Sequence, residues 1–218
     1  MNIKEVFNIV DEVVLPKGNV RPGFTSYHVY LTLNECAKTP LGRKTLSNIL
    51  GIGEGSVRTL VRRLYNVGLI AVDPVAGVLL TEKGFEVLEL LKNNVLMVGS
   101  FDFSDIELCR DCRISVVLLK NGVKLVEEVG GVLYVRDLIV KKGGVGGLIL
   151  YYIEGSFKLP DSYGLYEITN QEFWKNMLSS FKVVDGDCIL ASICRRGDMN
   201  CLMYVVEAAL DVLRGALR

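Results

Sequence analysis

The sequence is poor in the residue types on which several classes of function depend. Among its 218 residues there is one histidine, His28, and the formal net charge is zero. His28 falls in an apolar helical stretch and is isolated, so we interpret it as structural, which excludes Ser-His-Asp and Cys-His catalysis within one chain. A neutral chain also argues against a protein that coats nucleic acid through bulk positive charge.

Long hydrophobic runs are absent as well. No apolar run approaches the roughly 18 residues that a membrane span requires, and the first residues, Met1 to Glu5, lack the apolar core of a secretory signal. We therefore expect a cytoplasmic protein with no membrane association. Half of the residues are hydrophobic, which is ample for buried cores, and the length suits two modest domains or one large one.

The six cysteines show no zinc-module spacing. Cys109 and Cys112 form a single C-x-x-C pair without a second pair or a nearby histidine. Reduced thiols packed as small hydrophobic groups are the favoured interpretation in a cytosol. Metal or redox use of this pair and a disulfide are the alternatives, and we expect no cofactor or metal.

The most informative segment covers residues 46–80. A short helix around Leu46 to Leu50 is followed by a turn at Gly51, and a second helix begins near Ser56. Its apolar residues recur at i, i+3, i+4 and i+7, which predicts one buried stripe: Val57, Leu60, Val61 and Leu64. The opposite side carries Ser56, Arg58, Thr59, Arg62, Arg63 and Asn66.

The residues after this helix predict a β-hairpin and a closing helix. Residues 69–72 and 78–80 form the two strands around a turn at 73–77, and Thr81 is a good N-cap for the helix that follows. Two more helices are expected upstream, over residues 3–14 and 26–38.

Positive charge is concentrated on this segment. Between Lys38 and Asn66 there are six basic residues and one acidic residue, Glu54. Such a compact basic footprint is typical of a site-specific nucleic-acid binder, with a solvated helix face as the alternative. We expect Ser56 and Thr59 to approach base edges, while the guanidiniums of the second helix contact phosphates or guanine. The full predicted DNA-binding set is Arg43, Lys44, Ser56, Arg58, Thr59, Arg62 and Arg63.

Residues 26–92 resemble the winged helix-turn-helix of bacterial and archaeal transcriptional regulators. Leu46 and Leu50 face the core, Ser47 is small at the helix crossing and Gly51 takes the turn, as in that motif. Leu80-Thr81-Glu82-Lys83-Gly84, followed by an apolar helix, is similar to the segment that closes the wing in MarR-like regulators. The complete layout also resembles uncharacterised archaeal winged-helix proteins with a C-terminal domain of unknown role. The resemblance implies a DNA-binding fold for the N-terminal third.

From about residue 95 the sequence becomes β-rich with glycine punctuation. Residues 114–120 and 123–126 are predicted to form a hairpin around Asn121-Gly122, and residues 148–153 and 157–159 form a second one. Helices are expected around residues 134–141, 170–181 and 198–217, with a buried strand over 187–193.

Two features of this half suggest a ligand site. The glycines at 143–147 indicate a bend or close backbone packing, with a pocket wall as the alternative, and Gly144 and Gly146 are the candidates there. Arg195 and Arg196 lie between a buried strand and the last helix, where free N–H groups suit a small anionic effector. The acidic residues around Cys109 are interpreted as solvated, with a divalent site as the alternative.

The sequence thus predicts an α+β fold, with an N-terminal winged helix-turn-helix (1–94) followed by a compact mixed α/β domain (95–218). The expected function is that of a DNA-binding transcriptional regulator, not an enzyme, with a small-molecule effector domain. Because one recognition helix covers few base pairs, we expect a homodimer on double-stranded DNA. The alternatives are a winged-helix protein–protein interaction module and an enzyme with a regulatory winged helix.

Overall fold

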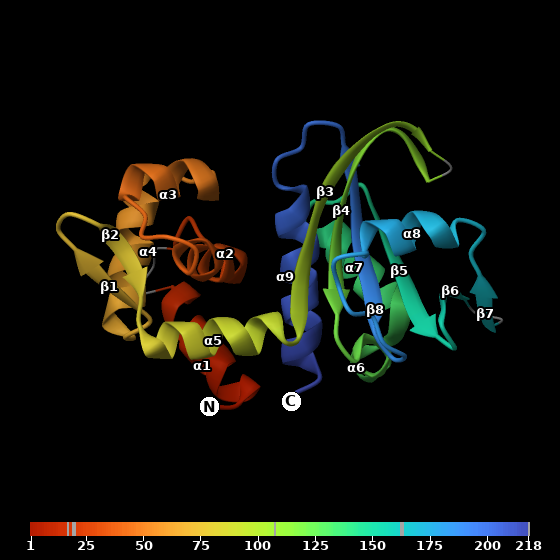
Figure 1. Cartoon of the computed structure of the whole chain (residues 1–218), viewed down its shortest axis with the longest axis horizontal. Coiled ribbons are helices and arrows are strands. Elements are labelled where there is room, and N and C mark those ends of the chain that lie inside the picture. Colours follow the sequence, from red (N-terminus) through yellow and green to blue (C-terminus); the bar gives the residue numbers. More distant parts are fainter. Residues whose placement is uncertain (17, 19–20, 107, 162–163, 218) are drawn as a thin grey trace. The chain divides into compact units, whose positions relative to one another are not determined.

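The structure is a computed structural model that describes residues 1–16, 18, 21–106, 108–161 and 164–217 (Figure 1). The chain divides into two compact units, Met1–Lys92 and Asn93–Arg218. The first is helical with a small β-hairpin, and the second is built on one sheet, so the fold is mixed α+β as predicted. In the described part of the chain, no helix has both the length and the apolarity needed to cross a membrane.

In its described residues, the first unit has five helices and a two-stranded antiparallel sheet (Figure 1). The elements are α1 (Ile3–Val14), α2 (Ser26–Cys36), α3 (Arg43–Leu50), α4 (Glu54–Asn66), β1 (Ile70–Asp73), β2 (Gly77–Leu80) and α5 (Glu82–Lys92). These match the helices and the hairpin that the sequence predicts. The apolar stripe of α4 is buried as expected, at Val57, Leu60, Val61 and Leu64.

Local capping explains where several of these helices begin. Asn2 accepts a hydrogen bond from the Glu5 amide at 2.9 Å, and Glu5 returns one to the Asn2 amide, so α1 starts with a capping box. Thr81 caps α5, because its Oγ1 accepts from the Gly84 amide at 3.0 Å. Gly51 follows α3 in the left-handed region, with φ of 65°, a conformation that glycine adopts without a Cβ clash.

The hairpin is fixed to the start of α3 through Leu41. Leu41 and Val78 exchange two backbone hydrogen bonds, of 3.0 and 2.9 Å. A Cβ on Gly77 would lie 2.6 Å from the Leu41 carbonyl oxygen, and φ of Gly77 is 97°. Glycine is therefore required at this close approach, and the hairpin holds a fixed place beside α3.

The second unit is a six-stranded antiparallel sheet with helices on its faces (Figure 1). The strands lie in the order β3-β4-β8-β5-β6-β7. They are β3 (Val95–Ile106), β4 (Cys109–Leu119), β5 (Gly146–Ile153), β6 (Ser156–Asp161), β7 (Gly164–Glu167) and β8 (Cys188–Arg195). The helices are α6 (Gly122–Val129), α7 (Gly131–Lys142), α8 (Gln171–Met177) and α9 (Cys201–Gly215).

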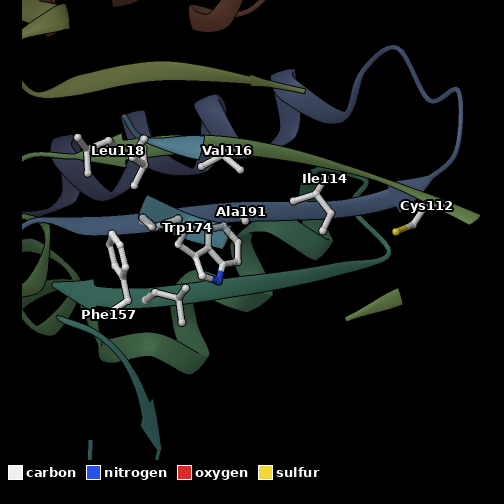
Figure 2. Close-up of a cluster of buried hydrophobic side chains, with 10 residues drawn as sticks. Cys112, Ile114, Val116, Leu118, Phe157, Trp174 and Ala191 are labelled. Atoms are coloured by element: carbon white, nitrogen blue, oxygen red, sulfur yellow. The ribbon is translucent and has the colours of Figure 1, made fainter. Parts of the chain in front are cut away.

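The two faces of this sheet are covered unequally. Helices α7 and α9 pack on one face, where alternate residues of β4 and β8 point toward α9; Ser192 Oγ, for example, donates to the Cys201 carbonyl at 2.6 Å. The other face carries the cluster shown in Figure 2, which includes Val116, Phe157 and Ala191 and is covered by the short helix α8 through Trp174. This second face contains the cavity described below.

The predicted hairpin at residues 114–126 is wrong. Residues 114–119 belong to β4, but Gly122–Val129 form helix α6. The reason is tertiary: β4 is already paired on both edges, with β3 and β8, so no edge remains for a strand at 123–126. Instead Asn121 donates its amide to the buried Asp187 carboxylate, which also pairs with Lys120, and the chain turns into the helix.

The favoured assignment of reduced thiols is also wrong for four of the six cysteines. Cys109 is bonded to Cys112, and Cys194 to Cys201. Cys36 and Cys188 are free and buried, as the packing interpretation predicted. The first disulfide joins two residues at the start of β4, and the second connects the end of β8 to the first residue of α9.

The glycines at 143–147 form a bend with close backbone packing, as the favoured interpretation held. Gly143 and Gly144 end α7 by donating to the carbonyls of Val140 and Ile139. A Cβ on Gly147 would lie 3.1 Å from Ile139 Cδ1 and 3.3 Å from the Arg136 carbonyl oxygen. The glycines thus let the start of β5 pass close to α7.

Candidate functional site

Helix α4 presents its polar side to solvent. Arg58 and Arg62 are exposed, whereas Ser56 and Thr59 are half-buried. Thr59 Oγ1 donates to the Gly55 carbonyl at 3.1 Å. At the start of α3, Arg43 and Lys44 are exposed. Six of the seven residues predicted to face DNA therefore have side chains that are at least partly accessible.

Arg63 is the exception, and the structure corrects its assignment. Its side chain is buried, and Nη1 donates to the carbonyls of Val13 at 2.6 Å and Leu15 at 2.8 Å. The guanidinium also lies 5.5 Å from the centroid of the Phe24 ring. Because the last carbonyls of a helix lack partners within it, Arg63 completes the end of α1 and is not available to an external ligand.

A groove of about 660 Å³ runs along one side of α4. Its α4 side includes Ser56, Thr59, Arg62 and Asn66, and its other side is the segment Arg21 to Phe24. Arg21 is exposed, so it adds a cation beside the polar side of α4. Sequence reasoning missed Arg21, because the Pro-Gly break gives no indication that this segment returns to α4.

A second groove, of about 760 Å³, separates α4 from the hairpin. Arg43, Arg58 and Arg62 line it together with the turn residues at 73–77. Asp73 Oδ1 accepts from the amides of Val75 and Ala76 at 2.8 and 2.7 Å, and these hydrogen bonds hold the pKa of Asp73 below its usual range. Arg62 lines both grooves, so it stands on the ridge of α4 between them.

The four residues predicted to bind an effector lie at one end of the large sheet. Gly146 pairs with Ile193 at the start of β5, and Arg195 ends β8 opposite Cys112. Gly144 is buried, and Arg196 is exposed. Among the described residues, none of these four lines the two grooves beside α4 or the cavity on the α8 side of the sheet. The structure thus brings the four residues to one end of the sheet.

Three of the acidic residues around Cys109 are paired with arginines, and Asp105 and Asp111 remain exposed to solvent, as the sequence predicted. The fourth residue of this predicted cluster, Glu107, lies outside the described residues. Asp102 forms two hydrogen bonds of 2.8 Å with Arg113, which lower the pKa of its carboxyl group. Asp111 pairs with Arg196 at 3.2 Å, and Asp105 with Arg110 at 3.4 Å. Within the described residues no group of three or more potential ligands converges on a metal position. Arg196 is thus already paired with a carboxylate.

The comparisons with known proteins concern both units. Residues 30–86 match the family model described as the PH0730-like, N-terminal domain, which spans the segment from α2 into α5. A comparison with curated proteins found no match. Among solved structures, the chain is similar to "Hypothetical protein PH0730 from Pyrococcus horikoshii OT3", with a TM-score of 0.63 and 21% sequence identity.

That similarity covers 88% of this chain and 94% of the other. It therefore extends over both units and shows a shared fold. At this identity it supports the α+β architecture alone, and the name of the similar protein assigns no activity.

Proposed function

We propose that the protein is a DNA-binding transcriptional regulator whose first unit is a winged helix. In this interpretation α3 and α4 are the helix-turn-helix, α4 is the recognition helix and β1–β2 is the wing. One observation carries the proposal: α4 buries its apolar stripe and leaves Arg58 and Arg62 exposed, with a groove on each side. A helix presented in this way fits the major groove.

The residues that we propose to contact DNA differ in two positions from the set predicted from the sequence. Arg63 leaves the set, and Arg21 joins it, because Arg21 lies across a groove from Ser56, Thr59 and Arg62. The N-terminal end of α4 carries Ser56 and Thr59, the residues suited to base edges. Arg43 and Lys44, at the start of α3, are suited to the phosphate backbone.

The direct test is duplex binding by the full chain, measured by fluorescence anisotropy with a labelled random-sequence duplex of about 30 base pairs over a range of salt concentrations. We expect Arg58→Ala/Arg62→Ala to weaken binding at least tenfold. The slope of log K against log salt should fall by about 0.9 for each lost phosphate contact.

The matched control is Arg110→Ala/Arg136→Ala. It removes the same charge from exposed positions of the second unit, and it should bind as the wild type does. If Arg58→Ala/Arg62→Ala shows wild-type affinity and an unchanged salt slope, the DNA-binding proposal is wrong.

The homodimer is part of the same proposal. A single α4 helix covers a few base pairs, so useful specificity requires two copies on a two-fold site. Light scattering should give twice the chain mass of 24.1 kDa, and a selected duplex should contain two related half-sites. A monomer that binds a single short site would contradict this part.

A protein–protein role for the winged helix is the second candidate, and the hairpin turn favours it. Val75 at the turn is 97% exposed and Val72 is 53% exposed, and Asp73 is the one charged residue within the turn at 73–77. An apolar tip suits a protein surface better than a phosphate backbone. Val75→Asp distinguishes the two roles, since it should abolish a protein contact and weaken DNA binding less than Arg58→Ala/Arg62→Ala does.

A further inference from the structure

A cavity of about 710 Å³ opens on the α8 side of the large sheet. Leu148 and Leu150 of β5 line it from the sheet, and Phe173 and Trp174 line it from α8. Trp174 lies over the sheet among the apolar side chains of the cluster in Figure 2. The cavity is therefore continuous with the core of the second unit.

The curvature of the sheet creates this cavity. Ile106 at the end of β3 and Tyr166 of β7 line the same space, although β3 and β7 are the two opposite edges of the sheet. The edges therefore approach each other over this face. Phe103 of β3 contacts Phe173 of α8 at a centroid distance of 5.5 Å, so β3 also reaches the helix that lines the cavity.

Helix α8 is held in place but is too short to fill the space. It has seven residues. Gln171 anchors it to β6, because its side-chain amide accepts from the Phe157 amide at 2.9 Å and donates to the Phe157 carbonyl at 2.6 Å. The wall formed by Phe173 and Trp174 is thus fixed, and the volume beside it stays open.

The lining has the composition of a small-molecule site. The volume lies within the range of roughly 300–1,000 Å³ typical of such sites. Three large apolar side chains at its mouth are exposed: Leu108 by 40%, Leu159 by 37% and Tyr166 by 50%. Exposed apolar side chains gathered at one cavity indicate a surface that a ligand covers.

The charge of the lining restricts the ligand. Among the described residues that line the cavity, Glu167 is the one charged side chain, and Thr169 supplies a hydroxyl close to it in the sequence. An anionic ligand would lie beside this carboxylate, and no cation among the described lining residues would offset the repulsion between the two negative charges. The lining therefore favours a ligand without negative charge.

The geometry points to a binding site for an uncharged, largely aromatic or branched apolar molecule whose hydrogen-bonding group lies near Glu167 and Thr169. This inference deepens the effector part of the proposed function and rests on it for its regulatory meaning. The described lining of the cavity does not include Arg195 or Arg196 at the end of β8, where the sequence predicted a ligand.

Two related fluorescent probes test the site on the full chain without DNA. N-phenyl-naphthylamine is uncharged, and anilinonaphthalene sulfonate is its sulfonated analogue. Trp174 is the single tryptophan and lines the cavity, so it is an energy donor located at the site. We expect saturable energy transfer from Trp174 to the uncharged probe, and at least tenfold weaker binding of the sulfonate.

Two substitutions locate the site. Leu159→Lys places a cation at the mouth of the cavity. It should weaken binding of the uncharged probe at least tenfold and reduce the difference in affinity between the uncharged probe and the sulfonate. Glu167→Gln, on an exposed position, should strengthen the sulfonate severalfold without affecting folding. Leu133→Lys is the control, since Leu133 is 62% exposed on α7 and α7 packs against the opposite face.

The proposal is overturned if the uncharged probe shows no saturable energy transfer, or if Leu159→Lys and Leu133→Lys bind it equally while both retain wild-type circular dichroism. The fluorescence measurement contains no DNA, so its outcome does not depend on whether Arg58→Ala/Arg62→Ala weakens duplex binding. A failure of the ligand site and a failure of the DNA-binding proposal are therefore distinguishable.

Discussion

Arg62 and Arg63 are adjacent in the sequence but lie in opposite environments. Arg62 is exposed between two grooves, and Arg63 is buried against the end of α1. Adjacent positions of a helix point about 100° apart, so two neighbouring cations can serve different purposes. Arg63 therefore has a structural role, whereas Arg62 is available for the DNA contact that we propose.

We expect Arg63→Ala to lower the free energy of unfolding of the first unit by about 1–3 kcal/mol, because it leaves the Val13 and Leu15 carbonyls without their donor. Arg62→Ala should change it by less than about 0.5 kcal/mol and weaken duplex binding instead. Urea unfolding and anisotropy on both variants provide the measurement. Equal stabilities would show that the buried hydrogen bonds contribute little.

His28 provides a pH-dependent test at the same scale. Burial lowers its pKa to about 4, and Nδ1 accepts from the Thr25 amide at 3.0 Å, so the folded state holds the neutral ring. The unfolded state, with an ordinary histidine pKa near 6.5, binds more protons between these values. The contribution of His28 to stability is therefore full above about pH 6.5 and is lost as pH falls toward 4.

The chain has one histidine, so its ring resonances can be followed by NMR without ambiguity. We expect no titration above pH 5, and a decrease in stability that approaches about 1.4 kcal/mol per pH unit between pH 6 and 5. A midpoint near 6.5 in the folded protein would contradict this prediction.

At the scale of elements, glycines in two helices have opposite roles. Gly84 lies in the first turn of α5, where a Cβ would lie 2.1 Å from the Leu69 carbonyl oxygen. Gly55 lies in the first turn of α4, where a Cβ would contact nothing within 4 Å. The intrinsic helix propensity of glycine is the same at both positions. Tertiary packing therefore decides whether a larger residue is tolerated at each one.

Gly84→Ala should therefore destabilise the first unit by about 1–3 kcal/mol through overpacking. Gly55→Ala should stabilise it by about 0.5–1 kcal/mol, because alanine loses less backbone entropy in a helix. Thermal and urea unfolding of the two variants against wild type measure both effects. Stabilisation by Gly84→Ala would mean that α5 shifts away from Leu69 at no cost.

The sequence predicted helices and strands correctly where residues close together in the chain determine the local structure. The 3.6-residue stripe of α4, the Thr81 cap and the turn at 73–77 are local signals, and the structure confirms all three elements. Residues 123–126 were misassigned because Asn121-Gly122 is a good hairpin turn locally, whereas the pairing of β4 with β8 is decided by residues about 70 positions away. Strand β3 was also missed, although Phe101 and Phe103 alternate with Asp102 and Ser104.

At the scale of the whole molecule, each unit has its own core. The cluster around Trp174 draws all its members from the second unit, and α1 packs on α2, α4 and α5 within the first. We expect fragments 1–92 and 93–218 each to unfold cooperatively in urea, followed by circular dichroism. A fragment that gives a gradual transition, while the full chain gives a sharp one, would show that its core is incomplete alone.

The sequence by itself determined the helices and hairpin of the first unit, the polar side of α4 and the approximate place where the chain divides. These follow from periodicity, capping and turn residues within a few positions of one another. The tertiary structure alone decided that Arg63 is structural, that Arg21 lies beside α4, that four cysteines are paired, and that an apolar cavity forms under α8. Each of these depends on which distant segments meet, and that is set by strand pairing and packing between residues far apart in the chain.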